Sequence, residues 1–337
     1  MFSNKTILIT GGTGSFGKKM AKKILNKYKP KKIIIYSRDE LKQYNLQKEL
    51  YKYKKQTRYF IGDVRDLPRL KKSFHNVDYV IHAAALKHVT VAEYNPFEAV
   101  KTNIIGTQNV VEASLEMGVE KVISLSTDKA SSPVNLYGAT KLTADKLVVA
   151  GNYHKGTVST KLSVVRYGNV FGSRGSIVPH LLNFKGDGKF PVTNINMTRF
   201  SITLDEGIEF VLKCMKKMWG GEIFVPKIHS YKLIDLVNAL SKNNKIKLIG
   251  IRPGEKIHEE MISVNDSLNT LELKDSYVIC PSKEFIEWDF KKFKKTFKGK
   301  SCKENFSYSS NKNKFLTISD LKKYVKNNIN DFELDNK

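Results

Sequence analysis

The 337-residue chain is 41% hydrophobic, enough for one large α/β domain with a smaller appendage. Its net charge of +25 comes mostly from lysines in short clusters, without a base-reading motif, so we expect a lysine-rich solvated surface and no nucleic-acid partner. The three cysteines lack metal-ligand spacing, no apolar run approaches the roughly 18 residues of a membrane span, and no signal peptide precedes the first strand. We therefore expect a cytoplasmic protein with no metal and no membrane partner.

The first predicted strand, residues 5–10, runs directly into a glycine-rich turn, and a helical stretch follows. Glycines let the backbone turn tightly and approach a pyrophosphate, while the helix N-terminus offers free N–H groups and a positive dipole. We predict a dinucleotide site here; the alternative is an ordinary tight turn between a strand and a helix. The expected contacts are Gly11, Thr13, Gly14, Ser15, Phe16 and Gly17.

The second predicted strand, residues 32–36, bears on which dinucleotide is bound. An acidic residue at this strand end usually holds the ribose hydroxyl of NAD, whereas an arginine accommodates the 2′-phosphate of NADP. Ser37 and Arg38 precede Asp39, and Lys42 follows one turn later, so we predict NADP, with NAD held by Asp39 as the alternative.

The third and fourth predicted strands, residues 58–62 and 78–83, add to the same site. Asp63 and Val64 fall where the adenine would lie, although Asp63 could equally cap a helix. The small residues Ala83 and Ala84 end the fourth strand and would let the cofactor and the substrate approach.

The fifth predicted strand, residues 121–127, leads into the residues with the most reactive side chains. Tyr137 and Lys141 are four residues apart, so on a helix they share one face, and a neighbouring ammonium favours the phenolate of a tyrosine. Asp128 and Lys129 supply a second acid/base pair at the same mouth. One pair can serve a hydride transfer, and two pairs indicate further proton chemistry beside the oxidised carbon.

The six strand signals, the last at residues 161–166, alternate with helical stretches. This pattern predicts an α/β fold, a Rossmann-type doubly wound parallel sheet with a smaller C-terminal substrate-binding lobe. We expect residues 1–170 to form the NADP-binding domain with the catalytic residues, and residues 171–337 to form mainly the substrate lobe, interleaved with returns to the core. The glycine-containing loops at 172–175 and 184–191 mark this change, and a helix is expected at about 318–327, starting at Thr317 or Ser319.

Four motifs, in this order, resemble those of the extended short-chain dehydrogenase/reductase family: residues 10–17, residues 63–66, Tyr137-x-x-x-Lys141, and residues 166–170. Within it, the chain resembles the inverting UDP-N-acetylglucosamine 4,6-dehydratases of the type that opens pseudaminic acid biosynthesis. The closer resemblance lies in residues 37–40, 85–89, 92–96, 126–130, 197–200, 220–227 and 252–256. Ser201 and Thr90 depart from the residues common there, a bulky side chain and proline, and neither removes a reacting group.

The resemblance implies catalytic roles for five residues. Tyr137, with its pKa lowered by Lys141 and the nicotinamide charge, would take the proton of the sugar C4 hydroxyl, and Thr127 would hydrogen-bond the C4 oxygen. Lys129, with a pKa that burial could bring near 7, would take the C5 proton; the alternative is a phosphate-binding or structural cation. Asp128 would protonate the departing C6 hydroxyl.

The resemblance also implies UDP-N-acetylglucosamine as substrate and a homo-oligomeric assembly. The residues expected to hold the diphosphate are Lys87, Arg199 and Arg252, with Asn169 contributing. Glu255 would reach the uridine ribose or pair locally with Lys256.

Two other functions remain open from the sequence. A UDP-sugar 4-epimerase would share the cofactor site, Tyr137 and Lys141, but it has no need of Asp128 and Lys129. A non-catalytic dinucleotide-sensing protein would fit the basic charge, but it has no use for a reactive tyrosine.

Overall fold

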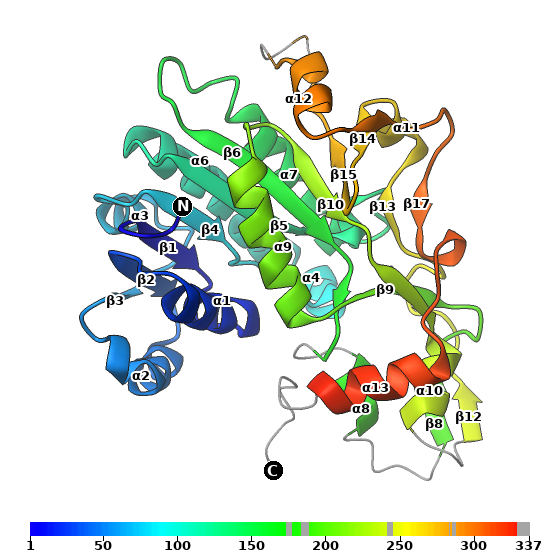
Figure 1. Cartoon of the computed structure of the whole chain (residues 1–337). Coiled ribbons are helices and arrows are strands. Elements are labelled where there is room, and N and C mark those ends of the chain that lie inside the picture. The colour runs from blue at the N-terminus through cyan, green and yellow to red at the C-terminus, as the bar shows by residue number, and fades with distance from the viewer. Residues whose placement is uncertain (173–176, 183–188, 241–244, 283, 285–287, 329–337) are drawn as a thin grey trace.

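A computed structural model describes residues 1–172, 177–182, 189–240, 245–282, 284 and 288–328 of the chain. Its centre is a ten-stranded sheet in the order β16-β14-β15-β10-β6-β5-β4-β1-β2-β3 (Figure 1). The six strands predicted from the sequence are confirmed, as β1 (Thr6–Thr10), β2 (Lys32–Ser37), β3 (Thr57–Ile61), β4 (Tyr79–His82), β5 (Lys121–Thr127) and β6 (Lys161–Tyr167). All neighbours among these six are parallel. Their order, 3-2-1-4-5-6, is that of a dinucleotide-binding Rossmann fold.

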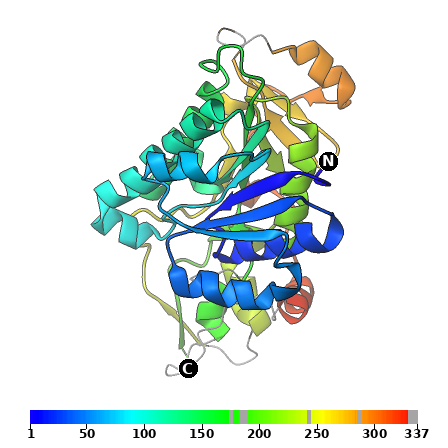
Figure 2. The same cartoon turned by 90° about the vertical axis from the view of Figure 1, so that its left-hand side faces the viewer.

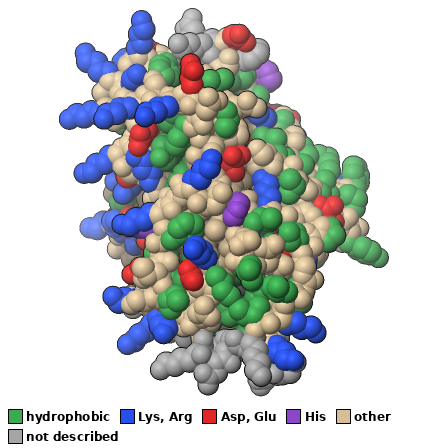
Figure 3. Space-filling model, turned by 90° about the vertical axis from the view of Figure 1, so that its right-hand side faces the viewer, with side chains coloured by type: hydrophobic (Ala, Val, Ile, Leu, Met, Phe, Trp, Pro, Cys, Tyr) green, Lys and Arg blue, Asp and Glu red, His purple; other side chains and the backbone are tan. Residues whose placement is uncertain are grey.

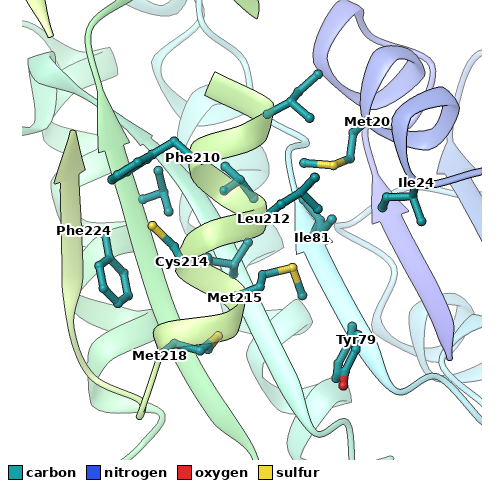
Figure 4. Close-up of a cluster of buried hydrophobic side chains, with 14 of the residues drawn as sticks. Met20, Ile24, Tyr79, Ile81, Phe210, Leu212, Cys214, Met215, Met218 and Phe224 are labelled. Carbon is teal, nitrogen blue, oxygen red and sulfur yellow. The ribbon is translucent and has the colours of Figure 1, made fainter. Parts of the chain in front are cut away.

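Helices cover both faces of this sheet (Figure 2). Alternate residues of β1 show why: Ile7 and Ile9 face one buried cluster and Leu8 faces another. The first cluster lies under α1 (Ser15–Lys27) and α9 (Leu204–Lys217), which contribute Met20 and Met215 to it (Figure 4). The second lies under α3 (Leu67–Ser73), α6 (Gly106–Glu116) and α7 (Leu136–Ala150). This arrangement confirms the predicted doubly wound α/β fold.

Shorter helical segments connect the strands of the first half. Helix α2 (Glu40–Glu49) and the turn η1 (Tyr51–Tyr53) lie between β2 and β3. Between β4 and α6 the chain forms α4 (Val89–Tyr94), α5 (Pro96–Ala99) and one π-helical stretch, η2 (Val100–Ile105). The turn η3 (Asp128–Ala130) follows β5 directly.

The chain returns to the main sheet after residue 170. Strand β10 (Ile223–Pro226) pairs in parallel with β6 and antiparallel with β15 (Ser276–Ile279). Strands β14 (Thr270–Glu272) and β16 (Lys300–Ser301) extend this antiparallel edge. The short helices α11 (Val264–Ser267) and α12 (Phe290–Thr296) belong to the same part of the fold.

A smaller lobe lies beyond the ends of the parallel strands (Figure 1). It contains a third buried cluster, built on α8 (Ile177–Leu182), β8 (Lys189–Val192), α10 (Leu233–Leu240) and α13 (Ile318–Asn328). Among the described residues, two small sheets accompany it: β11 (His229–Lys232) with β9 (Thr198–Ile202) and β7 (Asn169–Val170), and β12 (Lys245–Leu248) with β8. A further pair, β13 (Glu260–Ile262) with β17 (Tyr308–Ser309), packs on the second cluster of the main sheet. The turn η4 (Ser310–Lys312) follows β17.

The predicted C-terminal helix is confirmed as α13, and Thr317 rather than Ser319 starts it. The Thr317 hydroxyl accepts from the backbone N–H of Asp320 at 3.1 Å, which is an N-cap contact. Most of the two glycine-containing loops expected after residue 170 lies outside the described residues. Within the described part of the chain, no helix has the length and apolarity to cross a membrane, and no group of three or more His, Cys, Asp or Glu side chains could hold a metal.

Candidate active site

The glycine turn after β1 has the geometry that a dinucleotide pyrophosphate requires. Gly11 has a φ of +64°, and a Cβ there would lie 2.9 Å from the backbone nitrogen of Ala84. A Cβ on Gly17 would lie 2.5 Å from the Cα of Gly12, so only glycine lets α1 start this close to the turn. Gly14, the exposed N-cap of α1, has no side chain to block its end. These residues fit a dinucleotide, because the backbone and the helix N-terminus remain accessible to phosphate.

The other predicted turn residues support the same loop. Thr13 is buried, and its hydroxyl lies 2.6 Å from that of Ser37 at the end of β2. Ser15 and Phe16 form the first turn of α1, and Phe16 packs against the core under that helix. The backbone of Ala83 and Ala84 lies close to Gly11, and the N–H groups of both alanines donate to the Thr10 hydroxyl.

Arg38 and Asp39 have different surroundings at the end of β2. The Arg38 side chain is 53% exposed, and its Nη1 lies 3.3 Å from the Asp63 carboxylate. Asp39 caps α2 by accepting from the Lys42 N–H at 2.9 Å, and its second oxygen pairs with the Lys42 ammonium. Both oxygens of Asp39 are therefore engaged within the chain, whereas much of Arg38 faces solvent.

The alternative that Asp63 caps a helix is wrong. Asp66 caps α3 by accepting from the Arg69 N–H, while Asp63 is held by the Arg65 guanidinium at 2.7 Å. Burial alone would raise the pKa of Asp63, but Arg65 and Arg38 hold it below its ordinary value. The Val64 side chain is buried in the core under α3 and α6, and its carbonyl oxygen accepts from the Asn109 amide at 3.0 Å, so the side chain is not available to an adenine.

A cluster of charged side chains occupies the ends of β5 and β6. The Lys129 ammonium lies 3.0 Å from Asp128 Oδ1 and 3.3 Å from Asn169 Oδ1, and the Thr127 hydroxyl donates to Asp128 Oδ1 at 2.9 Å. Asp128 is fully buried, and its Oδ2 has no hydrogen-bond partner. The structure thus brings together four of the predicted residues, with Asn169 reaching in from β7.

Burial raises the pKa of the Asp128 carboxyl above its ordinary value, and the Lys129 charge opposes this shift. The expectation that burial brings Lys129 to a pKa near 7 is wrong for this arrangement. Burial alone would lower the pKa of Lys129, but the charges of Asp128 and Glu259 raise it above its ordinary value. Lys129 is therefore a charged ammonium that can act as a base only after giving up a proton.

Tyr137 and Lys141 lie one turn apart on α7, as predicted. Burial raises the pKa of Tyr137 to about 12, while the Lys129 charge and hydrogen bonding with Thr127 favour the phenolate. Lys141 is buried and donates to the Leu125 carbonyl oxygen at 2.7 Å, and burial lowers its own pKa. The protein's own charges therefore do not give the low tyrosine pKa expected from Lys141.

The predicted diphosphate ligands are only partly brought together. Lys87 is exposed, on the chain between β4 and α4. Arg199, on β9, is 14% exposed and donates to the carbonyl oxygens of Thr198 and Ile257. Arg252 is 57% exposed and pairs with Glu255 at 3.9 Å. The alternative prediction that Glu255 pairs locally with Lys256 is wrong, because the Lys256 ammonium donates to the Ser131 carbonyl oxygen instead.

Glu259 is a member of this cluster that sequence reasoning missed. Its carboxylate lies 3.1 Å from the Lys129 ammonium and 3.8 Å from Arg199 Nε, and the side chain is 3% exposed. Its only signal in the sequence is its place three residues after the 252–256 motif, which gives no hint that it faces Lys129.

The family of polysaccharide biosynthesis proteins matches residues 7–281 of the chain. A protein of Campylobacter jejuni serotype O:2 named UDP-N-acetylglucosamine 4,6-dehydratase (inverting) is 55% identical over 317 residues, which covers 93% of this chain and 94% of the relative. A Rickettsia canadensis protein named UDP-glucose 4-epimerase is 41% identical, covering 83% of this chain and 84% of the relative.

Two solved structures agree with the fold. The X-ray structure of Pen from Bacillus thuringiensis has a TM-score of 0.88 and 40% identity, and the match covers 98% of this chain and 99% of that one. The dTDP-glucose 4,6-dehydratase DesIV from Streptomyces venezuelae, solved with NAD bound, has a TM-score of 0.68 at 18% identity over 97% of this chain and 99% of that one, which shows a shared fold alone. With the glycine turn, the 3-2-1-4-5-6 sheet and the Tyr137–Lys141 pair, these matches show that the chain belongs to the polysaccharide biosynthesis protein family, within the extended short-chain dehydrogenases/reductases.

Proposed function

We propose that this chain is a C5-inverting UDP-N-acetylglucosamine 4,6-dehydratase that uses NADP. The observation that carries this proposal is the joint position of Asp128 and Lys129, in contact at 3.0 Å, beside Thr127 and Tyr137. A relative of that name at 55% identity supports the substrate and the reaction.

When bound, the dinucleotide would supply a reversible hydride acceptor for the sugar C4. Tyr137 would remove the proton of the C4 hydroxyl, and Thr127 would hydrogen-bond the C4 oxygen. The resulting ketone acidifies the C5 proton, which Lys129 would take. Asp128, whose pKa burial raises above its ordinary value, would give its proton to the departing C6 hydroxyl when it carries one.

The contact between Asp128 and Lys129 addresses how a charged lysine serves as a base. One proton can be shared between the two groups over 3.0 Å, and with the proton on Asp128 the lysine is neutral. That form has both an acid for C6 and a base for C5. After water leaves, the proton taken from C5 can pass from Lys129 to Asp128, which restores the pair.

The surroundings of Arg38 and Asp39 support NADP over NAD. Asp39 is already engaged as a helix cap and with Lys42, whereas Arg38 offers an exposed guanidinium beside the predicted adenine position. An arginine there suits a 2′-phosphate. For the substrate, we propose that Lys87, Arg199, Arg252 and Asn169 approach the diphosphate and that Glu255 approaches the ribose. We further propose a homo-oligomer and residues 171–337 as mainly the substrate lobe.

A UDP-sugar 4-epimerase is the second candidate, because relatives of that type are about 40% identical. The two activities differ in mass. We expect UDP-N-acetylglucosamine incubated with the protein and NADP in heavy water to lose one water and gain deuterium. A product of unchanged mass would instead identify an epimerase. An unaltered substrate at every enzyme concentration would contradict both.

A further inference from the structure

The Lys129 ammonium has an acceptor for each of its three hydrogens. Asp128 Oδ1, Glu259 Oε1 and Asn169 Oδ1 lie at 3.0, 3.1 and 3.3 Å. They come from three separate parts of the chain: η3, the residue before β13, and β7. An ammonium group has three donors and no acceptor, so this arrangement fixes its orientation as well as its charge.

The backbone of Glu259 is held in place by hydrogen bonds with Ser310. Its backbone N–H donates to the Ser310 hydroxyl at 2.9 Å, and its carbonyl oxygen accepts from the Ser310 N–H at 2.8 Å. The Ser310 hydroxyl also lies 2.7 Å from that of Thr198, next to Arg199. The carboxylate is buried, with one oxygen facing Lys129 and the other without a hydrogen-bond partner. A buried carboxylate is costly unless its charge is compensated, so its place beside Lys129 calls for an explanation.

We propose that Glu259 is a positioning residue for the proposed dehydratase, holding the Lys129 amine against Asp128 and setting how tightly this pair keeps its shared proton. The inference rests on the proposed function, because it concerns the step at C5. Glu259 itself does not touch the reacting atoms. It acts through Lys129.

The charges around the pair explain the expected effect. Lys129 is faced by Asp128, Glu259, Arg199, Lys256, Tyr137 and Tyr231. Burial raises the pKa of Asp128 and Glu259 raises it further, while Glu259 also raises the pKa of Lys129. Without the Glu259 charge, both members of the pair should therefore release protons at lower pH.

The test uses four forms of the full chain with NADP: wild type, Glu259→Gln, Glu259→Asp and Glu272→Gln. Glu272 lies on strand β14, away from this cluster, and pairs with Lys227 at 2.8 Å. Glu272→Gln is therefore the control, because it also removes one carboxylate that is paired with a lysine. Two steps are measured separately across pH. Absorbance of the reduced cofactor in a single turnover reports the first hydride transfer, and C5 exchange, followed as loss of deuterium from a substrate labelled at C5, reports the step at Lys129. Melting temperature and retained cofactor check the fold.

We expect the wild type and Glu272→Gln to share one bell-shaped pH profile for C5 exchange. Glu259→Gln should move the centre of that bell to lower pH by about one unit, since a neighbouring charge shifts a pKa by roughly 1–3 units. Glu259→Asp keeps the charge but shortens the side chain, so it should lower the exchange rate about tenfold or more while leaving the centre and KM unchanged. The first hydride transfer should be retained in all four.

An unmoved bell in Glu259→Gln overturns the proposal, as does loss of the first hydride transfer in step with C5 exchange. If Glu259→Gln does not fold, Glu259→Asp decides: exchange at the wild-type rate contradicts the positioning role, and slowed exchange with an unmoved bell supports it. A wild type that dehydrates nothing would contradict the proposed function instead, which the heavy-water assay shows separately.

Discussion

At the scale of single residues, the proposed preference for NADP depends on Arg38. Its guanidinium is half exposed and has the Asp63 carboxylate beside it, so a 2′-phosphate would meet a donor that is already oriented. We expect Arg38→Ala to weaken NADP binding by about 1.5–3 kcal/mol, the range for hydrogen bonds to charged groups, and to leave NAD binding nearly unchanged. Titration of cofactor fluorescence measures both affinities. The control is Arg58→Ala, which removes an exposed arginine on β3. Equal affinities of the wild type for NADP and NAD would contradict the role assigned to Arg38.

In the proposed mechanism Tyr137 and Lys129 act at different steps, so we expect their variants to lose activity in different ways. Tyr137→Phe removes the proposed acceptor of the C4 proton, so neither reduced cofactor nor product should form. Lys129→Ala should still allow the first hydride transfer, while later steps slow by about 10²–10⁴-fold, the usual contribution of general acid–base catalysis. Single-turnover absorbance of the reduced cofactor separates the two. Near wild-type turnover of Lys129→Ala would exclude the proposed base.

At the scale of elements, a buried hydrogen-bond chain joins β1, β4 and α6. The Thr10 hydroxyl lies 2.7 Å from His82 Nδ1, and His82 Nε2 lies 3.1 Å from the Thr107 hydroxyl. Thr107 donates its own proton to the Asn103 carbonyl oxygen, so it can only accept from Nε2, and Nδ1 must be the acceptor. Neutral His82 is therefore satisfied on both nitrogens. Burial, with the Lys141 charge, lowers its pKa to about 3.

This buried histidine should make stability depend on pH. The unfolded chain protonates near pH 6.5 and the folded one near 3, so the unfolded state binds more protons between these values and stability falls as pH falls. We expect the contribution of His82 to grow as pH falls below 6.5 and to reach a loss of about 1.4 kcal/mol per pH unit between about pH 5.5 and pH 4. Urea unfolding of His82→Gln should lack this slope, whereas His75→Gln, an exposed histidine, should keep it. Equal slopes in wild type and His82→Gln would refute the assignment.

The elements that sequence patterns predicted are those determined by local residues. Strands such as 121–127 are predicted by their own apolar residues, and the glycines at 11, 14 and 17 predict the turn that they form. Predictions that depended on distant partners did worse. The pKa of Lys129 is set by Glu259, 130 positions later in the chain, and no local pattern reports that contact. Asp63 and Asp66 both precede a helix, and only the folded chain shows that Asp66 caps it.

At the scale of the whole molecule, the net charge of +25 comes mostly from lysines in short clusters along the chain. Lysine and arginine side chains project along the left edge of the face in Figure 3, with fewer acidic groups between them. Half-buried surface pairs such as Lys23–Glu209 contribute little to stability individually. The main consequence is a positive field that would favour the approach of anions such as the proposed diphosphate substrate.

The configuration of the product tests the whole site at once. If Lys129 takes the C5 proton and another group returns one from the opposite face, the 4-keto-6-deoxy sugar should have the L-arabino configuration. A site that returns the proton to the same face of C5 would give the D-xylo sugar. Proton NMR of the freshly formed product distinguishes them, because the orientation of H5 changes its couplings to neighbouring protons. The spectrum must be recorded early, since the 4-ketone lets C5 epimerise slowly in solution. An early spectrum with the D-xylo sugar alone would show that the Asp128–Lys129 pair does not invert C5, even if water is lost.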